Sequence, residues 1–333
     1  MNKIYTLLIA ATLFSCVKDP RVNVVKTKKA CFQGPSAIIY GANNINKLSD
    51  VEDRDLQDIS KSVAAIVSKK RLFKDSNRSD DELTFFGTRL AHGDLMCDSS
   101  LNSQRTGARC SSFLVGPDVI ATAAHCLDDS KNEGLSPIEV CNKNRIIFDF
   151  DESRFLNDHS NNGRISESDI FKCEKIIDYK LDDDHDYALI KLDRVVEGRQ
   201  ALKMLDPVDL SYGSEISTIG FPQGIVMRAS TEGKYYELST NKNWLNTQLD
   251  TFSGNSGGPI IDILTNMVVG IHTHGEEGAL ELNKSKGCFE YSKRCLDPRD
   301  CNTSAGFNIA KIPYLKDLVT QTSGLEREEI GCD

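Results

Sequence analysis

Short apolar segments, each ended by a turn, are the feature that most limits what this chain can fold into. Seven of them are three to six residues long and rich in Ile, Val, Leu, Ala and Phe. Gly, Asn, Asp and Pro separate them, as expected of strands joined by turns. The segments are Ser112–Val115, Val119–Ala121, Arg145–Phe150, Ala188–Leu192, Ile216–Gly220, Pro259–Ile263 and Met267–His272. Many short strands with few long helical patterns predict an all-β sandwich or a pair of β-barrels.

Two segments have the spacing of a helix instead. Apolar residues recur at intervals of three and four between Val51 and Val67, and again between Ile312 and Leu325. That periodicity places them on one helical face. We therefore expect one helix before the first strands and one at the end of the chain.

Length and charge exclude several other classes of protein. The chain has 333 residues, which at about 150 residues per domain corresponds to roughly two domain-sized units. The formal net charge of −9 is unfavourable for general nucleic-acid binding, which needs a basic surface. No internal stretch reaches the roughly 18 apolar residues that a membrane-spanning helix requires. A globular protein that binds no nucleic acid is the expected class.

The N-terminus predicts export. Met1–Lys3 gives a short positive start, and the apolar run Ile4–Phe14 has the length of a signal-peptide core. The run ends in Leu-Phe-Ser-Cys, which resembles the lipobox of bacterial lipoproteins, with residues 1–15 removed and Cys16 lipidated. A plain secretory signal with an incidental cysteine is the alternative. Under either interpretation the protein leaves the cytoplasm, and membrane association comes only through the lipid anchor.

Cysteine usage fits an exported protein. Eleven cysteines are present, and ten remain when Cys16 is set aside: Cys31, Cys97, Cys110, Cys126, Cys141, Cys173, Cys288, Cys295, Cys301 and Cys332. An even number in an exported chain suggests disulfides, whose pairing the sequence alone does not give. A structural zinc site is the alternative, but the cysteines are scattered and no C-x-x-C pair occurs. We expect no metal site and no cofactor.

Three short motifs carry the chemistry. Thr-Ala-Ala-His-Cys contains His125, Asp-Tyr-Ala-Leu-Ile begins at Asp186, and Gly-Asn-Ser-Gly-Gly-Pro contains Ser256. A serine hydroxyl is a weak nucleophile, so it needs a base to take its proton and an acid to orient that base. Glycines beside the serine allow backbone amides to point at a developing oxyanion. The order His, Asp, Ser and the intervals of 61 and 70 residues suit such a triad.

Each motif alone has a simpler explanation. A single histidine is more often a core or surface residue, Asp186 belongs to the acidic run 182–186, and a glycine-rich turn is common. The combination of all three in a fixed order is what favours catalysis.

This set resembles the trypsin/chymotrypsin superfamily of serine endopeptidases over about residues 60–320. The resemblance implies two six-stranded Greek-key β-barrels, residues 61–205 and 206–333, with a C-terminal helix and an active site between the barrels. Residues 16–60 would then be a tether or pro-region. By that match His125 is the general base, Asp186 orients it, and Ser256 attacks the scissile carbonyl. The amides of Gly254 and Ser256 would form the oxyanion hole.

The resemblance also implies a disulfide between Cys110 and Cys126, which would brace the histidine loop. The segments Ile38–Gly41, Leu249–Ser256 and Gly270–His272 resemble the bacterial glutamyl-endopeptidase-like branch of the superfamily. Trypsin-type enzymes have an Asp before the nucleophile, which pairs with a freshly cut N-terminus. Asn255 stands there in this chain, so we predict that activation does not depend on such an ion pair.

The specificity pocket gives conflicting signals. Asp250 occupies the position that binds substrate Lys or Arg in trypsin-like enzymes, whereas Thr251 and His272 match the positions that bind substrate Glu. A buried Asp and a substrate carboxylate would repel. The alternative for Asp250 is a structural hydrogen-bonding role, and for His272 it is packing. His274 lies two residues after His272, so a strand would place both rings on one face. No third ligand is evident, so a metal is not expected.

Two further expectations concern the same part of the chain. Thr273 matches the family position whose hydroxyl contacts the catalytic Asp and whose carbonyl contacts the substrate backbone. The residues from Thr273 to Gly275 would pair with an extended peptide as an added strand. The insertion 275–306 carries three cysteines, and we expect a disulfide-braced loop beside the pocket.

The leading hypothesis is an exported serine endopeptidase that acts on proteins or peptides through an acyl-enzyme. A non-catalytic binding protein on the same scaffold is the alternative. An esterase of the α/β-hydrolase class is disfavoured, because that fold orders the triad Ser, acid, His.

Overall fold

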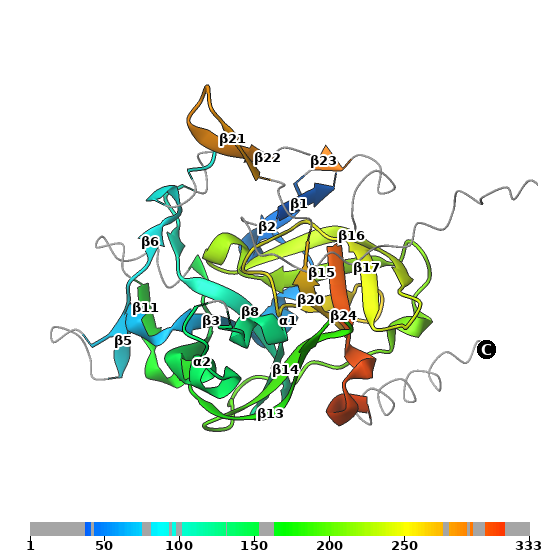
Figure 1. Cartoon of the computed structure of the whole chain (residues 1–333), viewed down its shortest axis with the longest axis horizontal. Coiled ribbons are helices and arrows are strands. Elements are labelled where there is room, and N and C mark those ends of the chain that lie inside the picture. The colour runs from blue at the N-terminus through cyan, green and yellow to red at the C-terminus, as the bar shows by residue number, and fades with distance from the viewer. Residues whose placement is uncertain are drawn as a thin grey trace, which may run out of the picture. The chain divides into compact units, whose positions relative to one another are not determined.

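A computed structural model gives the fold of the chain. It describes residues 37–40, 43–74, 81–92, 95–97, 102–130, 132–152, 163–275, 280–291, 294–295 and 304–316. Two antiparallel seven-stranded sheets form its centre (Figure 1). Within the described ranges, no helix is long and apolar enough to cross a membrane. Cys16 and the signal segment lie outside these ranges.

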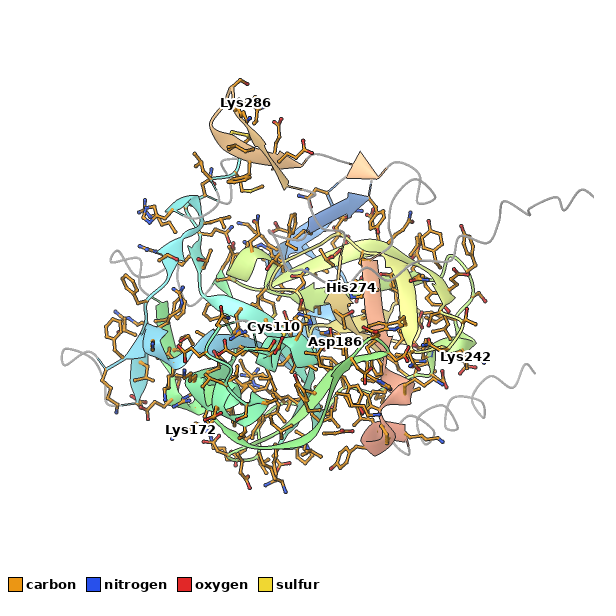
Figure 2. The ribbon with its side chains drawn as sticks, viewed as in Figure 1. Cys110, Lys172, Asp186, Lys242, His274 and Lys286 are labelled. Atoms are coloured by element: carbon orange, nitrogen blue, oxygen red, sulfur yellow. A yellow bond between two sulfur atoms is a disulfide. The ribbon has the colours of Figure 1, made fainter. Side chains whose placement is uncertain are left out.

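The first sheet forms a barrel through one bent strand. Its order is β12 (Ile170–Phe171), β10 (Asn144–Phe148), β3 (Val63–Ser68), β8 (Ala108–Gly116), β9 (Val119–Thr122), β14 (His185–Leu192) and β13 (Cys173–Asp182). The end strands β12 and β13 are continuous in sequence except for Lys172 (Figure 2), whose N–H donates to the Asp193 carboxylate at 2.9 Å. At that bend the chain stops pairing with β10, through β12, and starts pairing with β14, through β13.

The second sheet closes by hydrogen bonds. Its ring runs β15 (Glu215–Gly220), β19 (Pro259–Asp262), β20 (Met267–His274), β24 (Ser304–Asn308), β17 (Trp244–Gln248) and β16 (Arg228–Leu238), which pairs with β15 again. The short strand β2 (Ile45–Lys47) adds to the outside of β16. The predicted all-β fold with two barrels is therefore confirmed.

All seven predicted strands occur in these barrels, but the predicted helix Val51–Val67 is wrong in its second half. Helix α1 spans only Arg54–Ser60, and Asp53 caps it by accepting the Asp55 and Leu56 amides at 2.9 and 3.2 Å. Val63–Val67 instead belong to β3 and are all buried. Their side chains enter two different core clusters, so both faces of the strand are covered. This continuous apolar run imitated the spacing of a helix.

The C-terminal part of the expected tether is built into the domain. Strand β1 (Ala37–Tyr40) pairs with β18 (Thr251–Phe252), and β2 belongs to the second sheet. Residues 37–60 are therefore not an extended tether, because their backbone pairs with the barrel and Val51 and Leu56 enter the core. Residues 17–36 lie outside the described ranges.

The C-terminal helix predicted for 312–325 is not tested over most of its length. The described part consists of two 3-10 turns, Ile309–Lys311 and Pro313–Leu315, that bury Ile312 and Leu315 in the core. Residues 317–325 lie outside the described ranges.

The remaining elements are short and lie outside the two barrels. They are β4 (Leu72–Phe73), β5 (Glu82–Phe85), β6 (Thr88–Arg89), β7 (Arg105–Thr106), β11 (Gly163–Ser166), α2 (Pro137–Lys143), β21 (Leu280–Asn283), β22 (Cys288–Tyr291) and β23 (Arg294–Cys295). Strands β21 and β22 form a hairpin with Lys286 near its tip (Figure 2).

Disulfides join Cys97 to Cys288, Cys110 to Cys126 and Cys141 to Cys173. The expected disulfide-braced insertion is thus attached through Cys288 to the segment before β7. The base of its hairpin contacts a small apolar cluster that includes Phe252 of β18. Cys31, Cys301 and Cys332 lie outside the described residues.

Candidate active site

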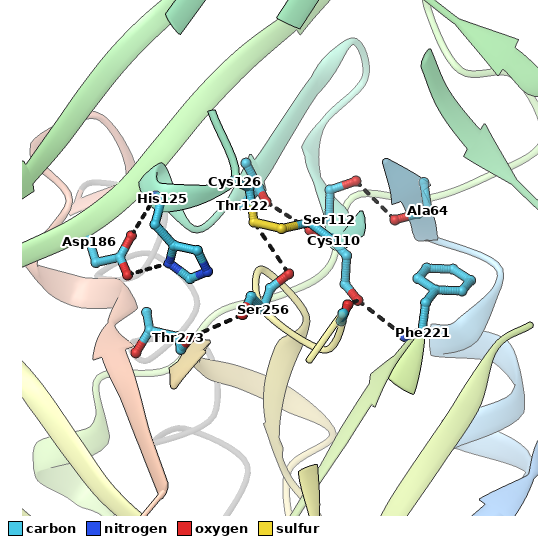
Figure 3. Close-up of a disulfide and its surroundings, with 12 residues drawn as sticks. Ala64, Cys110, Ser112, Thr122, His125, Cys126, Asp186, Phe221, Ser256 and Thr273 are labelled. Carbon is cyan, nitrogen blue, oxygen red and sulfur yellow. Dashed lines mark hydrogen bonds and ion pairs between the residues drawn. A yellow bond between two sulfur atoms is a disulfide. The ribbon is translucent and has the colours of Figure 1, made fainter. Parts of the chain in front are cut away.

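His125 and Asp186 come together from two neighbouring segments of the first barrel. His125 lies in the 3-10 turn Ala124–Leu127 that follows β9, and Asp186 is the second residue of β14. The His125 Nδ1 is 2.7 Å from Asp186 Oδ2, and the His125 backbone N–H donates to Oδ1 at 3.0 Å (Figure 3). Two contacts to one carboxylate fix both the ring and the turn that carries it.

The charges of this pair support each other. Burial lowers the pKa of His125, but the charge and hydrogen bond of Asp186 outweigh that effect and raise the pKa above its usual value. Burial raises the pKa of Asp186, and His125 more than compensates, so this pKa stays below its usual value. Asp186 therefore remains ionised and favours the imidazolium form of its neighbour.

Ser256 lies beside this pair with its hydroxyl turned away from the ring. Its carbonyl oxygen is 3.6 Å from the Sγ of Cys126, the residue after His125. Its hydroxyl donates to the Thr273 carbonyl at 3.0 Å (Figure 3), and the described residues contain no hydrogen bond between Ser256 and His125. A rotation about one side-chain bond is needed before His125 can accept the serine proton.

The backbone around Ser256 presents two amides without protein acceptors. The Ser253 carbonyl accepts the Gln223 N–H at 2.6 Å, and the Asn255 carbonyl accepts the Gly258 N–H at 2.9 Å. In a planar trans peptide the N–H points opposite to the C=O. The amides of Gly254 and Ser256 belong to these two peptides and donate to no acceptor in the described part of the chain. Such fixed donors are the components of an oxyanion hole.

Glycine is required at this turn for two separate reasons. Gly254 has φ +99°, and a Cβ there would lie 2.2 Å from the Phe221 carbonyl oxygen. The Asn255 N–H donates to the Phe252 carbonyl at 3.0 Å, which closes a turn that needs positive φ at Gly254. Gly257 has φ +89°, and its Cβ would lie 2.0 Å from the Ser111 carbonyl oxygen. The predicted glycine-rich turn is thus packed directly against the first barrel.

The disulfide that the family resemblance implied joins β8 to the residue after the histidine. Cys110 of β8 is linked to Cys126 (Figure 3). The same two sulfurs and the His125 ring form a group close enough to hold a metal ion. Because the sulfurs are bonded to each other, they are not thiolates and do not suit a metal.

Comparison with known proteins identifies the domain. Residues 110–271 match the family model of the trypsin-like peptidase domain. Just under half of the chain is therefore similar to a trypsin-like peptidase domain. The match begins at Cys110 and ends within β20, so it contains His125, Asp186 and Ser256.

Two solved structures similar to this chain are described as proteases. A Glu endopeptidase in complex with MPD is 14% identical, with a TM-score of 0.48 over 86% of this chain and 100% of that one. The VesB protease of Vibrio cholerae is 16% identical, with a TM-score of 0.46 over 86% of this chain and 68% of that one. A search of curated proteins finds no match.

Within the matched stretch 110–271, Asp250 contacts the backbone of residues 40 and 44. Its Oδ1 accepts the Tyr40 N–H at 2.7 Å and its Oδ2 accepts the Asn44 N–H at 2.8 Å. Burial raises the pKa of Asp250 to about 6, although the two amides act in the opposite direction. With both oxygens occupied by backbone donors, Asp250 has the structural role that was the alternative to binding a substrate Lys or Arg.

Thr251 and His272 are buried polar residues without polar partners. The Thr251 Oγ1 and the His272 Nδ1 have no hydrogen-bond partner among the described residues. Burial, with smaller effects of the nearby His274 and His125, lowers the pKa of His272 to about 3, so the ring is neutral. Thr251 is five residues before Ser256, and the His272 carbonyl accepts the Gly257 N–H at 2.7 Å. Both residues therefore adjoin the nucleophile turn.

Thr273 corrects one expectation. Its hydroxyl donates to the Ala305 carbonyl at 3.0 Å and lies 3.0 Å from the His274 Nδ1, rather than contacting Asp186. A register shift between β20 and β24 falls at this residue, between His272 and His274, which turns the hydroxyl toward β24. The pairing of β20 with β19 ends at Ile271, so the β19 side of Thr273 and Gly275 is the edge to which a substrate strand would be added.

Sequence reasoning missed the residues that hold the nucleophile turn from outside. Ser111 and Gln223 donate to its carbonyls, and Gln223 does so from a left-handed backbone with φ +52°. A non-glycine residue at positive φ is uncommon and often marks a functional constraint. Nothing in the sequence distinguishes Gln223 from an ordinary loop residue. Ser111 had only a weak signal, as one of the few polar residues in a mostly apolar strand.

Proposed function

We propose that this protein is a serine endopeptidase that hydrolyses peptide bonds through an acyl-enzyme. The observation that carries the proposal is the meeting of the His125–Asp186 pair with a turn that offers two unpaired amides beside Ser256. A peptidase acts on proteins or peptides, and the edge at Thr273 and Gly275 suits an extended chain.

The residues assign each step. Ser256 releases the Thr273 carbonyl, gives its proton to His125, and bonds to the scissile carbonyl carbon. The oxyanion that forms is stabilised by the Gly254 and Ser256 amides. His125 then gives its proton to the departing amine, which breaks the peptide bond and leaves an ester on Ser256. Water enters, loses a proton to His125 and bonds to the acyl carbon. The ester bond then breaks, Ser256 takes the proton back from His125, and the acid product leaves. Asp186 stabilises the imidazolium throughout.

We further propose that the preferred residue before the cleaved bond is Glu. Asp250 is already bonded to two amides, so it supports a Lys or Arg preference poorly. A carboxylate would supply an acceptor for the His272 ring N–H and the Thr251 hydroxyl, which otherwise stay buried and unpaired at a cost. The substrate charge would also favour protonation of His272.

The decisive test uses a fluorophosphonate probe and a peptide library. Wild-type protein should form a covalent adduct on Ser256 and cleave after Glu, and Ser256→Ala should lose activity by on the order of 10⁶. Cleavage after Lys or Arg would contradict the assignment of Asp250 and His272. Activity that persists in Ser256→Ala would contradict the mechanism.

One observation favours a second candidate, a binding protein without catalysis. The Ser256 hydroxyl bonds to Thr273 rather than to His125. If that arrangement is permanent, folded protein will form no adduct with the probe but will still bind peptides.

We also propose that the protein is exported and anchored to the bacterial cell envelope through a lipid on Cys16. The support is the short apolar run before that cysteine. Mass spectrometry of the mature N-terminus should find a lipidated Cys16, and Cys16→Ser should release the protein from the membrane fraction. An unmodified N-terminus at another residue would exclude the anchor.

A further inference from the structure

Ser111 is a fully buried hydroxyl that reaches from the first barrel into the nucleophile turn. It follows Cys110 in β8 and has 0% exposure. Its Oγ donates to the Gly254 carbonyl at 2.8 Å and accepts the Phe221 N–H at 3.2 Å. One hydroxyl thus joins the turn to the end of β15.

The backbone of the same residue holds the turn at a second point. The Ser111 N–H donates to the Ser256 carbonyl at 2.7 Å, and its own carbonyl accepts the Thr122 hydroxyl at 2.7 Å. The surroundings are closely fitted, because a Cβ on Gly220 would lie 2.7 Å from the Ser111 Oγ. Every polar group of Ser111 is therefore engaged, and two of them act directly on the predicted oxyanion loop.

Glycine itself does not select the conformation that this loop needs. Gly254 sits at φ +99°, but a glycine adopts negative φ about as easily. The choice must come from the bonds on its two sides. Gln223 fixes the peptide before Gly254 through the Ser253 carbonyl, and Ser111 fixes the peptide after it through the Gly254 carbonyl.

We propose that Ser111 is a positioning residue for hydrolysis, which holds the Gly254 amide in the direction of the oxyanion. The proposal rests on the proposed function of Ser256. Ser111 does not touch substrate, so its hydroxyl should affect the transition state and leave ground-state peptide binding almost unchanged. Its loss should therefore lower kcat with little effect on KM.

The adjacent Ser112 provides a matched control. It is also 0% exposed, and its hydroxyl donates to the Ala64 carbonyl of β3 at 3.1 Å, away from the nucleophile (Figure 3). Ser111→Ala and Ser112→Ala each remove one buried hydroxyl from the same strand. A general effect of losing a buried hydrogen bond should appear equally in both.

The experiment measures peptide hydrolysis and inhibitor binding by both variants below their unfolding temperatures. Ser111→Ala should lose at least about tenfold in kcat, with KM within about twofold. It should bind a peptide aldehyde, which forms a tetrahedral adduct on Ser256, about tenfold more weakly, and the matching peptide alcohol equally well. Ser112→Ala should match wild type in all four quantities.

A second variant guards against misfolding. Ser111→Thr keeps a hydroxyl on the same carbon and should retain most of the wild-type kcat. An unchanged kcat in Ser111→Ala, or an equal loss in Ser112→Ala, would overturn the proposal. An inactive wild type that takes no fluorophosphonate would refute the proposed function as well, whereas an active wild type with an unaffected Ser111→Ala would refute only this inference.

Discussion

The carbonyl groups of the nucleophile turn accept hydrogen bonds, whereas the neighbouring Thr251 and His272 have buried side-chain atoms without partners in the described structure. Three of the four carbonyls from Ser253 to Ser256 accept a hydrogen bond from another segment, with Ser111 of the first barrel and Gln223 as donors. The Asn255 carbonyl accepts the Gly258 N–H within the turn. At Thr251 and His272, buried polar atoms have no partner in the described structure. The two regions adjoin, because the His272 carbonyl accepts the Gly257 N–H.

This difference separates two tasks. Groups that stabilise a transition state work best when they are fixed before the reaction, since reorganisation then costs nothing. Groups that select a substrate must instead be completed by it, so that a wrong substrate leaves them unpaired. The groups of the turn are fixed in advance, whereas those of Thr251 and His272 are left for a substrate to complete. Changes in the turn should therefore alter rate, and changes at His272 should alter selectivity.

The largest predicted effect tests the turn. Gly254→Ala would place a Cβ 2.2 Å from the Phe221 carbonyl oxygen at φ +99°, so the backbone must move and the amide must turn. We expect kcat to fall by about 10²–10³, the loss typical of one oxyanion donor. Gly213→Ala is the control, because Gly213 also has positive φ, +84°, but nothing within 4 Å of the added carbon. Equal kcat in the two variants would contradict a fixed turn.

The next effect tests the specificity side. His272→Ala removes the unpaired ring nitrogen and should lower kcat/KM for Glu substrates by about 10–100-fold, the range of one hydrogen bond to a charged group. Matching Gln substrates should change much less, so the ratio of the two is the measurement. The exposed His92 provides the control variant, His92→Ala. An unchanged ratio in His272→Ala would show that His272 only packs.

The proposed catalytic residues could be recognised from the sequence because they lie in short motifs. A histidine, an acid and a glycine-flanked serine in that order predicted the contact between His125 and Asp186 over 61 residues. The partners of those motifs were not accessible. Ser111 and Gln223 act through hydrogen bonds that exist only after two distant segments meet, and a lone Ser or Gln carries no such signal.

The strands were predicted correctly where the sequence pattern was local. The prediction failed where complete burial gave a strand the apolar spacing of a helix. The seven expected strands follow from short apolar runs between turns. Val63–Val67 was assigned to a helix because a strand buried on both faces loses its alternation. Asp250 shows the same limit in the site, since its partners Tyr40 and Asn44 are 210 and 206 residues away. The residue type fixed the chemistry at that position, and the fold decided which group it meets.

Asp250 precedes Thr251, but both of its carboxylate oxygens accept hydrogen bonds, so it resembles the turn rather than the pair Thr251 and His272. A stability measurement can check this assignment. Burial raises its pKa to about 6, so the folded state holds the proton more tightly than the unfolded state. The stability from this shift is fully present below the unfolded pKa and is lost as pH rises through about 6. Asp250→Asn does not ionise, so wild type should lose about 1–3 kcal/mol relative to it between pH 4 and pH 7.

Urea unfolding of both proteins at the two pH values gives that difference. Asp262→Asn is the control, because Asp262 is also buried and accepts two hydrogen bonds from Thr265 within its own turn. A wild type that gains stability over Asp250→Asn as pH rises would show that the carboxylate is better accommodated than its burial indicates.

The smallest effect is a pH dependence that separates the two histidines. Asp186 raises the pKa of His125 above its usual value despite burial, whereas burial lowers that of His272 to about 3. Of these two histidines, only His125 should then titrate in the working range of the free enzyme. Because a general base must be neutral, kcat/KM should fall as pH drops through a midpoint above about 6.5. Glu and Gln substrates should share this midpoint, since both depend on the same His125. A midpoint that differs between them in the free enzyme would mean that His272 carries a proton before substrate arrives, and the unpaired nitrogen would then be a charged site rather than a neutral donor.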